Sequence, residues 1–377
     1  MKHLFILLLV FFSVESFATL DNTTCKKCHP IISTEYQKSM HAKSSIFKDP
    51  VHKAVWDKHP AKVKENYKCA KCHTPSDKDL LAKGGLPIQN QVQLTEPISC
   101  QLCHKIQSIE KHTKANKNIL SLKEKIFFSA DKALKGQKVI FKEKSHFFGL
   151  FKTKVGSPYH DIDYSNALFY NGNICMGCHS HKQNSQGFAV CDMEIKQGDS
   201  KETCISCHMP QVKGSLANQK QNATHAYHGH NIHTITPTTL SKYIKLSLSQ
   251  KDNRFEISIK NEATHTLFSQ PLRLNQLKVQ IERKGKSIPL ETKSFVKVIG
   301  KDGKPAMPWL ANEVLKDTLI KALETRKIDY NTTLQKGDSV VVQFGYYVVN
   351  PKAADKLGIT DKDVTKFIVL TSKRFNL

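Results

Sequence analysis

One short motif, Cys-x-x-Cys-His, occurs five times between residues 25 and 208 and constrains this chain more than any other feature. Its two thiols can form thioether bonds to the vinyl groups of one haem, and the adjacent histidine then binds the iron. The cysteines are Cys25, Cys28, Cys69, Cys72, Cys100, Cys103, Cys175, Cys178, Cys204 and Cys207. The histidines are His29, His73, His104, His179 and His208. The sequence therefore predicts five covalently bound c-type haems.

A cysteine pair of this spacing is also typical of half a zinc site or of a redox-active dithiol. A zinc ribbon gives no reason for a histidine directly after every pair, whereas haem attachment does. Because all five pairs carry that histidine, we prefer haem. The remaining cysteine, Cys191, is interpreted as a small buried apolar residue, with a reactive thiol or an intermolecular disulfide as the alternatives.

The start of the chain resembles a secretory signal. A basic start is followed by an apolar run over residues 4–12 and by the small-residue pattern Ser16-x-Ala18. The run is shorter than the ~20 residues that span a bilayer. We predict cleavage after Ala18 and a periplasmic protein that is not an integral membrane protein. Haem attachment outside the bacterial cytoplasm agrees with export.

The formal charge is +24, from 57 basic and 33 acidic residues. Such a balance can indicate nucleic-acid binding, but the predicted export and the lack of any recognition motif argue against it. Two interpretations remain, which are a solvated lysine-rich surface and steering toward redox partners with acidic docking surfaces.

The pattern of residues divides the chain into three parts. Residues 1–18 are the signal peptide, residues 19–237 form a pentahaem domain of helices and irregular links, and residues 238–377 form an antiparallel β-sandwich. The last part alternates apolar and polar residues at 244–248, 255–259 and 277–281, which is typical of half-buried strands. The fold class is therefore mixed, with about seven strands in the β-sandwich.

Other segments give weaker structural expectations. Residues 123–128 and 139–142, separated by Gly136, favour a hairpin in the haem domain. Residues 340–349 and 367–370 are expected strands, whereas residues 310–323 are ambiguous between helix and strand.

A second histidine on each iron would have to come from elsewhere in the chain. Four histidines lie within residues 225–233, a density that surface exposure explains poorly. His52 and His59 are alternatives for one distal ligand in the first half of the chain, and we prefer His52. From the cluster we choose His225 and His233, with His228 as a close alternative. The predicted distal ligands are His41, His52, His160, His181, His225 and His233.

The five motifs, the Ser39-x-His41 element and the Met209-Pro210 that follows the last motif resemble the multihaem cytochrome c superfamily. Within it, the chain is similar to the tetrahaem carriers that accept electrons from hydroxylamine oxidoreductase, here with a fifth haem motif. Those relatives often carry a Gly-His-x-Phe-Pro-Thr-Gly loop and an arginine in a C-terminal β domain. The corresponding His265 and Arg273 are present without the glycines, so we do not include His265 among the predicted ligands.

Two functions of different classes remain open, together with a structural or sensor subunit. The first is a periplasmic carrier that transfers electrons between partners in a respiratory chain, because two histidines per iron favour electron transfer. The second is a multihaem reductase of nitrite, hydroxylamine or a sulfur oxyanion. We prefer the carrier and name no catalytic residue, since no Cys-x-x-Cys-Lys is present and no arginine precedes Arg254.

Overall fold

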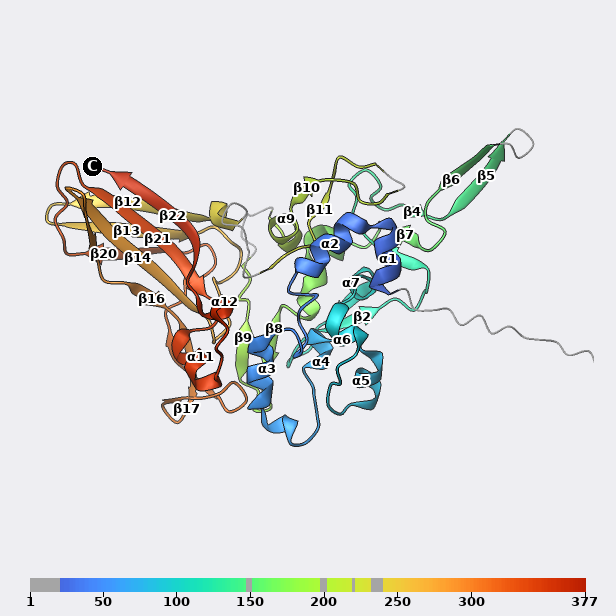
Figure 1. Cartoon of the computed structure of the whole chain (residues 1–377), viewed down its shortest axis with the longest axis horizontal. Helices are drawn as coiled ribbons and strands as arrows, with labels where there is room; N and C mark the ends of the chain where they lie inside the picture. The colour runs from blue at the N-terminus through green and yellow to red at the C-terminus, as the bar shows by residue number, and fades with distance from the viewer. Residues whose placement is uncertain (1–20, 147–150, 197–201, 219–220, 232–239) are drawn as a thin grey trace, which may run out of the picture.

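The structure is a computed structural model that describes residues 21–146, 151–196, 202–218, 221–231 and 240–377. Two parts lie side by side along the long axis of Figure 1. We call residues 21–231 the motif region and residues 240–377 the β region. The predicted signal peptide lies outside the described residues, and none of the described helices is long and apolar enough to cross a membrane.

Short helices and small two- or three-stranded sheets build the motif region. Asparagine and acidic side chains begin several of these helices; Asp49, for example, accepts hydrogen bonds from Val51 and His52 at the start of α3, with Pro50 in the first turn. The helices are α1 (Asn22–Cys28), α2 (Pro30–Lys38), α3 (Pro50–Asp57), α4 (Ala70–His73), α5 (Lys78–Lys83), α6 (Gln91–Thr95), α7 (Cys100–His104), α8 (Leu168–Asn171) and α9 (Cys204–His208), with 3-10 turns η1 (Pro60–Lys62) and η3 (Asn173–Gly177).

The strands of this region pair locally, with one exception. The pairs are β1 (Ile106–Glu110) with β2 (Lys117–Leu120), β5 (Lys142–His146) with β6 (Phe151–Val155), β8 (His181–Gln183) with β9 (Ala189–Asp192), and β10 (Gln211–Lys213) with β11 (Thr224–Ala226). The exception corrects our hairpin prediction. β3 (Ile126–Phe128) and β4 (Lys138–Val139) do not pair with each other, because β7 (Asp161–Asp163) lies between them.

Two antiparallel sheets and a smaller third one form the β region. The first sheet is β12 (Ile244–Lys251), β13 (Arg254–Asn261) and β20 (Thr325–Tyr330). The second contains β15 (Lys286–Pro289), β14 (Leu274–Arg283), β21 (Ser339–Tyr347) and β22 (Ile368–Asn376), with β16 (Lys293–Phe295) on β14. The third contains β18 (Lys304–Pro305), β17 (Lys297–Lys301) and β19 (Glu313–Asp317).

The predicted alternation is present in these strands. In β14, Leu277, Val279 and Ile281 are buried, and the register places them opposite Phe344, Val342 and Val340 of β21. Both larger sheets contribute to one apolar core. The ambiguous residues 310–323 contain only the strand β19. The region has more strands than predicted, because β15 to β19 are too short to show an alternating pattern, and it adds the helices α11 (Pro351–Leu357) and α12 (Lys362–Thr365) and the 3-10 turn η4 (Ser241–Tyr243).

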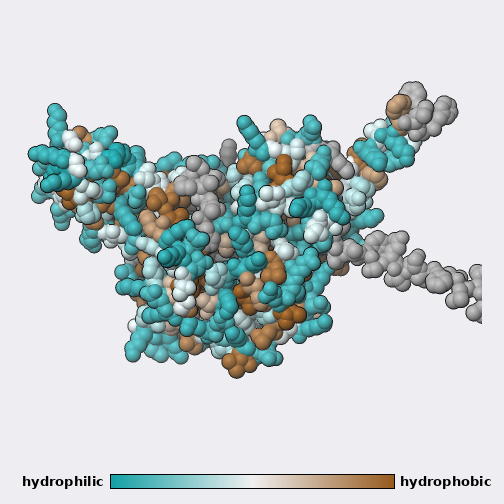
Figure 2. Space-filling model, in the orientation of Figure 1, coloured by the Kyte–Doolittle hydropathy of each residue, from teal (hydrophilic) through white to brown (hydrophobic). Residues whose placement is uncertain are grey.

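The two regions share an interface. Val51, Ala54 and Val55 of α3 pack against the core of the β region. In Figure 2, brown apolar residues gather over the motif region, whereas the far end of the β region is mostly hydrophilic. The β5–β6 hairpin projects away from the body at the opposite end of the molecule (Figure 1).

Candidate haem-binding sites

Four of the Cys-x-x-Cys-His motifs lie on or at the end of a short α-helix, and the fourth motif along the chain begins on the 3-10 turn η3, which ends before Cys178. In a helix, residues three apart share a face, so the two thiols of a motif point in the same direction. Three of these helices are capped by the side chain of the residue that precedes the helix. Asp21 accepts a hydrogen bond from the amide of Thr24, Ser99 from that of Leu102 and Thr203 from that of Ser206. The local sequence therefore fixes the geometry of the thiols before any long-range contact is made.

Backbone carbonyls orient some of the motif histidines, of which His29 and His104 are the clearest cases. His29 Nδ1 lies 2.8 Å from the carbonyl oxygen of Leu216, and His104 Nδ1 lies 2.7 Å from that of Phe128. A carbonyl only accepts, so Nδ1 carries the proton and Nε2 keeps its lone pair for a metal. This is the tautomer that haem ligation requires.

Four motif histidines face a second histidine at similar distances. The ring centres are 6.1 Å apart for His29–His160, 6.1 Å for His41–His179, 6.5 Å for His104–His228 and 6.2 Å for His208–His265. Two imidazoles bound on opposite sides of one metal, each with its nitrogen about 2 Å from it, place their ring centres about 6.3 Å apart. These four pairs therefore fit an iron with two histidine ligands.

Burial keeps these rings neutral. It is the main cause that lowers the pKa of His41 and of His228 to about 4, and that of His208 to about 3. Neighbouring histidines lower these pKa values further. Since only a neutral imidazole binds a metal, the surroundings favour ligation throughout the physiological range.

The second motif has a different arrangement. His73 and His52 have ring centres 3.9 Å apart, which is too close for a metal between them. Both rings lie near the carbonyl oxygen of Ser44, and His52 Nε2 lies 3.2 Å from the hydroxyl of Tyr67. His59 lies farther away, against Trp56 and Trp309. The structure thus brings the predicted His52 to the second motif without placing it opposite His73.

Two predicted ligands are not brought to a motif histidine. His181 Nε2 lies 3.0 Å from the carbonyl oxygens of both His112 and Thr113. His225 has partners for both ring nitrogens, Gly214 O at 3.0 Å and Glu35 Oε1 at 2.9 Å. The other oxygen of that glutamate accepts from the backbone N–H of His228, so His225 and Glu35 support the ligand beside them. His233 lies outside the described residues.

Two of the partners are not among the predicted ligands: His228, which was a close alternative, and His265. His228 belongs to the cluster of residues 225–233, where composition alone could not choose between members. His265 is contributed by the β region, from the loop that follows β13, and its nearest sequence signal was the incomplete loop pattern. A third histidine, His230, also lies near His208. Their ring centres are 4.7 Å apart and the ring planes are perpendicular, at 89°.

Cysteines of different motifs lie close enough to change each other's pKa. Before haem is attached, a hydrogen bond between thiols links Cys72 with Cys178 and lowers the pKa of Cys72 to about 7. The same kind of contact links Cys175 with Cys204 and lowers the pKa of Cys204 to about 7. Cys25 contacts Cys100 in the same way. These contacts join the first motif to the third, and the fourth motif to the second and the fifth. The effect of Cys103 on the pKa of Cys175 links the two sets into one contiguous group. Cys191, on β9, is half-buried, and burial raises the pKa of its thiol.

The structure also brings an arginine to the motif region. Arg273, from the β region, packs over the ring of Phe268, with 5.9 Å from its guanidinium carbon to the ring centre. Burial, His41 and then the charge of Arg273 lower the pKa of His230 to about 4. Arg273 also contributes to the lowered pKa of His179, after burial and neighbouring histidines. Although no arginine precedes residue 254, an arginine of the β region therefore influences these two histidines.

Comparisons with known proteins agree with this arrangement. Residues 24–105, which contain the first three motifs, match the family model described as cytochrome c554 and c-prime. A penta-haem cytochrome c552 from Thermochromatium tepidum has a similar structure, with a TM-score of 0.71 and 20% sequence identity. The match covers 95% of this chain and 99% of that one, so the two share a fold across both regions. No curated protein matches the chain.

Proposed function

We propose that this chain is a multihaem c-type cytochrome with covalently bound haems and that it carries electrons between redox partners outside the cytoplasm. The observation that carries the proposal is the set of four histidine pairs at the spacing of two axial ligands. When bound, haem iron supplies one-electron redox chemistry, and two histidines occupy the positions where a substrate would bind. The contiguous motifs give electrons a path through the molecule.

The same proposal has consequences for the charge of the protein, its partners and its location. The ten propionates of five haems, all ionised, would reduce the formal charge from +24 to about +14. A partner with an acidic docking surface would be steered toward such a protein. Export through the signal-like segment would place carrier and partner in the periplasm. We interpret the two larger sheets of the β region as a β-sandwich, whose role is to support the motif region or to dock partners.

Low-temperature EPR of the oxidised protein tests the carrier proposal. We expect low-spin signals from the haems whose histidines are paired, and weak binding of cyanide or nitrite at those sites. The second motif is the place where a high-spin signal would appear, since His52 does not lie opposite His73. Steady turnover of nitrite or hydroxylamine at tens per second with an artificial donor, within the usual range for enzymes, would end the carrier proposal.

A reductase of a small nitrogen or sulfur compound is the second candidate, and two observations favour it. The arrangement at the second motif differs from that of an iron with two histidines, and the guanidinium of Arg273 is near enough to lower the pKa of His179 and of His230. A guanidinium suits planar oxyanions better than lysine does. Arg273→Lys should lower reductase turnover if that activity exists, and should leave electron transfer between haems in place.

A further inference from the structure

The junction between the two regions is built around the loop that carries His265. After β9, residues 193–196 run beside this loop. The amide of Lys196 donates to the carbonyl of Thr264 at 2.8 Å, and the amide of Thr266 donates to that of Met193 at 3.3 Å. Backbone hydrogen bonds from the motif region therefore hold both neighbours of His265.

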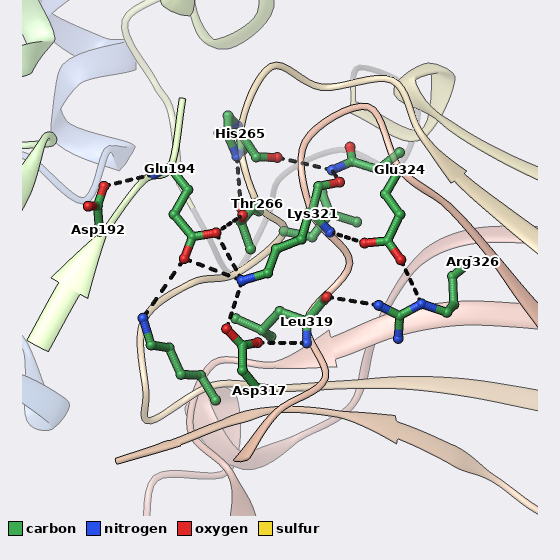
Figure 3. A network of polar contacts seen from close by, with 12 residues as sticks. Asp192, Glu194, His265, Thr266, Asp317, Leu319, Lys321, Glu324 and Arg326 are labelled. Atoms are coloured by element: carbon green, nitrogen blue, oxygen red, sulfur yellow. Dashed lines mark hydrogen bonds and ion pairs between the residues drawn. The ribbon is translucent and has the colours of Figure 1, made fainter. Parts of the chain in front are cut away.

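A single carboxylate strengthens this contact. Glu194 Oε2 accepts from the hydroxyl of Thr266 at 2.8 Å and from Nζ of Lys321 at 2.9 Å (Figure 3). Lys297, which is 8% exposed, lies 3.9 Å from the other oxygen. Glu194 itself has a positive φ of 48°, an uncommon conformation for a residue other than glycine. One residue of the motif region thus connects the His265 loop to two lysines of the β region.

The β region holds the loop from its other side. The side-chain amide of Asn261, which is fully buried, donates to the carbonyl of His265 at 3.0 Å and to that of Lys321 at 2.8 Å. The ring of His265 is oriented by its Nδ1, which lies 3.0 Å from the carbonyl of Thr266. As at the motif histidines, this bond leaves Nε2 available for a metal.

We propose that the β region supplies the sixth ligand of the fifth haem through His265, and that Glu194 is the positioning residue that keeps His265 opposite His208. This rests on the proposed function, since it explains how the fifth iron is closed to substrates. The β region then acts as part of a haem site. Release of the loop would leave the iron open to a small ligand or to His230, whose ring is perpendicular to that of His208.

The geometry explains why the carboxylate matters. Without its charge, Lys321 retains Asp317 at 2.7 Å, but the buried Lys297 loses the carboxylate beside it. A buried ammonium that loses its partner is costly. The ion pairs with the lysines also hold the carboxylate against the hydroxyl of Thr266, which is 1% exposed and adjacent to His265, so weakening them would loosen the loop.

Glu194→Gln tests the positioning role in the full-length holoprotein, by EPR and by titration of the reduced protein with carbon monoxide. We expect carbon monoxide to bind up to one haem in five, or the low-spin signal of one haem to change. Glu282→Gln is the matched control, because Glu282 makes an equivalent ion pair with Arg374 on the exposed surface of the second sheet. It should leave both measurements as in the wild type.

His265→Ala tests the ligand itself, and its double variant with His230→Ala covers exchange of ligands. In the single variant we expect carbon monoxide binding, or a new low-spin signal, because the ring angle to His208 would change from 26° toward 89°. The double variant should bind carbon monoxide at one haem, and added imidazole should restore the low-spin state. Circular dichroism establishes that the β region remains folded.

Three results separate the ideas. Spectra of the double variant identical to those of the wild type would show that His265 is not a ligand, and the carrier proposal would still stand. A changed His265→Ala spectrum with an unchanged Glu194→Gln spectrum would remove the positioning role of Glu194. A fifth haem that is already high-spin in the wild type would contradict the ligand assignment, and turnover of a small substrate there would also contradict the carrier proposal.

Discussion

The motif region and the β region stabilise themselves in different ways. Among the described residues, the β region has one connected core of 24 buried apolar side chains, whereas the largest such cluster of the motif region contains Trp56, Tyr67, Ala70 and Leu80. Four side chains do not stabilise a region of about two hundred residues. Porphyrin faces, held by cysteines on separate short helices, would supply the missing apolar contacts. The β region buries enough apolar area to fold by the ordinary hydrophobic effect.

We infer from this difference that the fold of the motif region depends on the covalent attachment of haem, whereas the fold of the β region does not. At the junction, the motif region depends on the β region. There the β region supplies His265, so a site in the first region would be incomplete without the second.

The largest expected effect is the loss of the motif region when haem is withheld. A chain produced in a compartment without haem attachment should be digested by protease through residues 21–231, while a fragment of residues 240–377 survives. That fragment, produced alone, should give a β-type circular dichroism spectrum, with some stability lost because α3 no longer covers its core. Protection of the motif region without haem would contradict the comparison.

A core substitution should have the next largest effect, and only on the β region. Phe255 is fully buried and stacks on Tyr330, with ring centres 5.3 Å apart. Phe255→Ala should lower the free energy of unfolding of the β region by about 3–5 kcal/mol, as measured by denaturant titration of a far-ultraviolet signal. Phe151→Ala, at a side chain that is 65% exposed, is the control and should change it by less than about 0.5 kcal/mol.

Salt should have a smaller effect, on rates. The reduced protein should be reoxidised by the anion ferricyanide more slowly as ionic strength rises, by up to about tenfold, because salt screens the attraction to a basic surface. The cation hexaammineruthenium should show the opposite trend in stopped-flow measurements. Equal salt dependence for both oxidants would show that the net positive charge does not steer encounters.

Acid should have the smallest effect, at the junction. Burial raises the pKa of Glu194, but hydrogen bonds from Lys321 and Thr266 outweigh it, so the pKa lies below the usual value. A carboxylate with a lowered pKa stabilises the folded junction above its ordinary pKa and loses that contribution as pH falls. The high-spin fraction of the fifth haem should therefore rise only at a pH below the range in which glutamate ordinarily titrates. Glu194→Gln should show the rise already at neutral pH and should lack this acid dependence.

Much of the molecule could be predicted from local patterns. The strands at 244–248, 255–259 and 277–281 follow from alternation, since period two is a property of the extended backbone. The short strands and helices between them lack such a period. The predicted hairpin failed for a related reason: β3 and β4 were close in sequence, but both found β7, which lies outside the window that a hairpin pattern considers.

The sequence by itself determined the five attachment motifs and their histidines, because the thiols and the imidazole of each motif lie within one turn of backbone. Only the tertiary structure decided which second histidine lies opposite four of them. His160, His41 and His265 reach His29, His179 and His208 from far along the chain, one of them from the other region. The same packing brought Arg273 to histidines in a part of the sequence that contains no arginine. No local pattern records such meetings, since they depend on how whole elements pack rather than on the spacing of neighbouring residues.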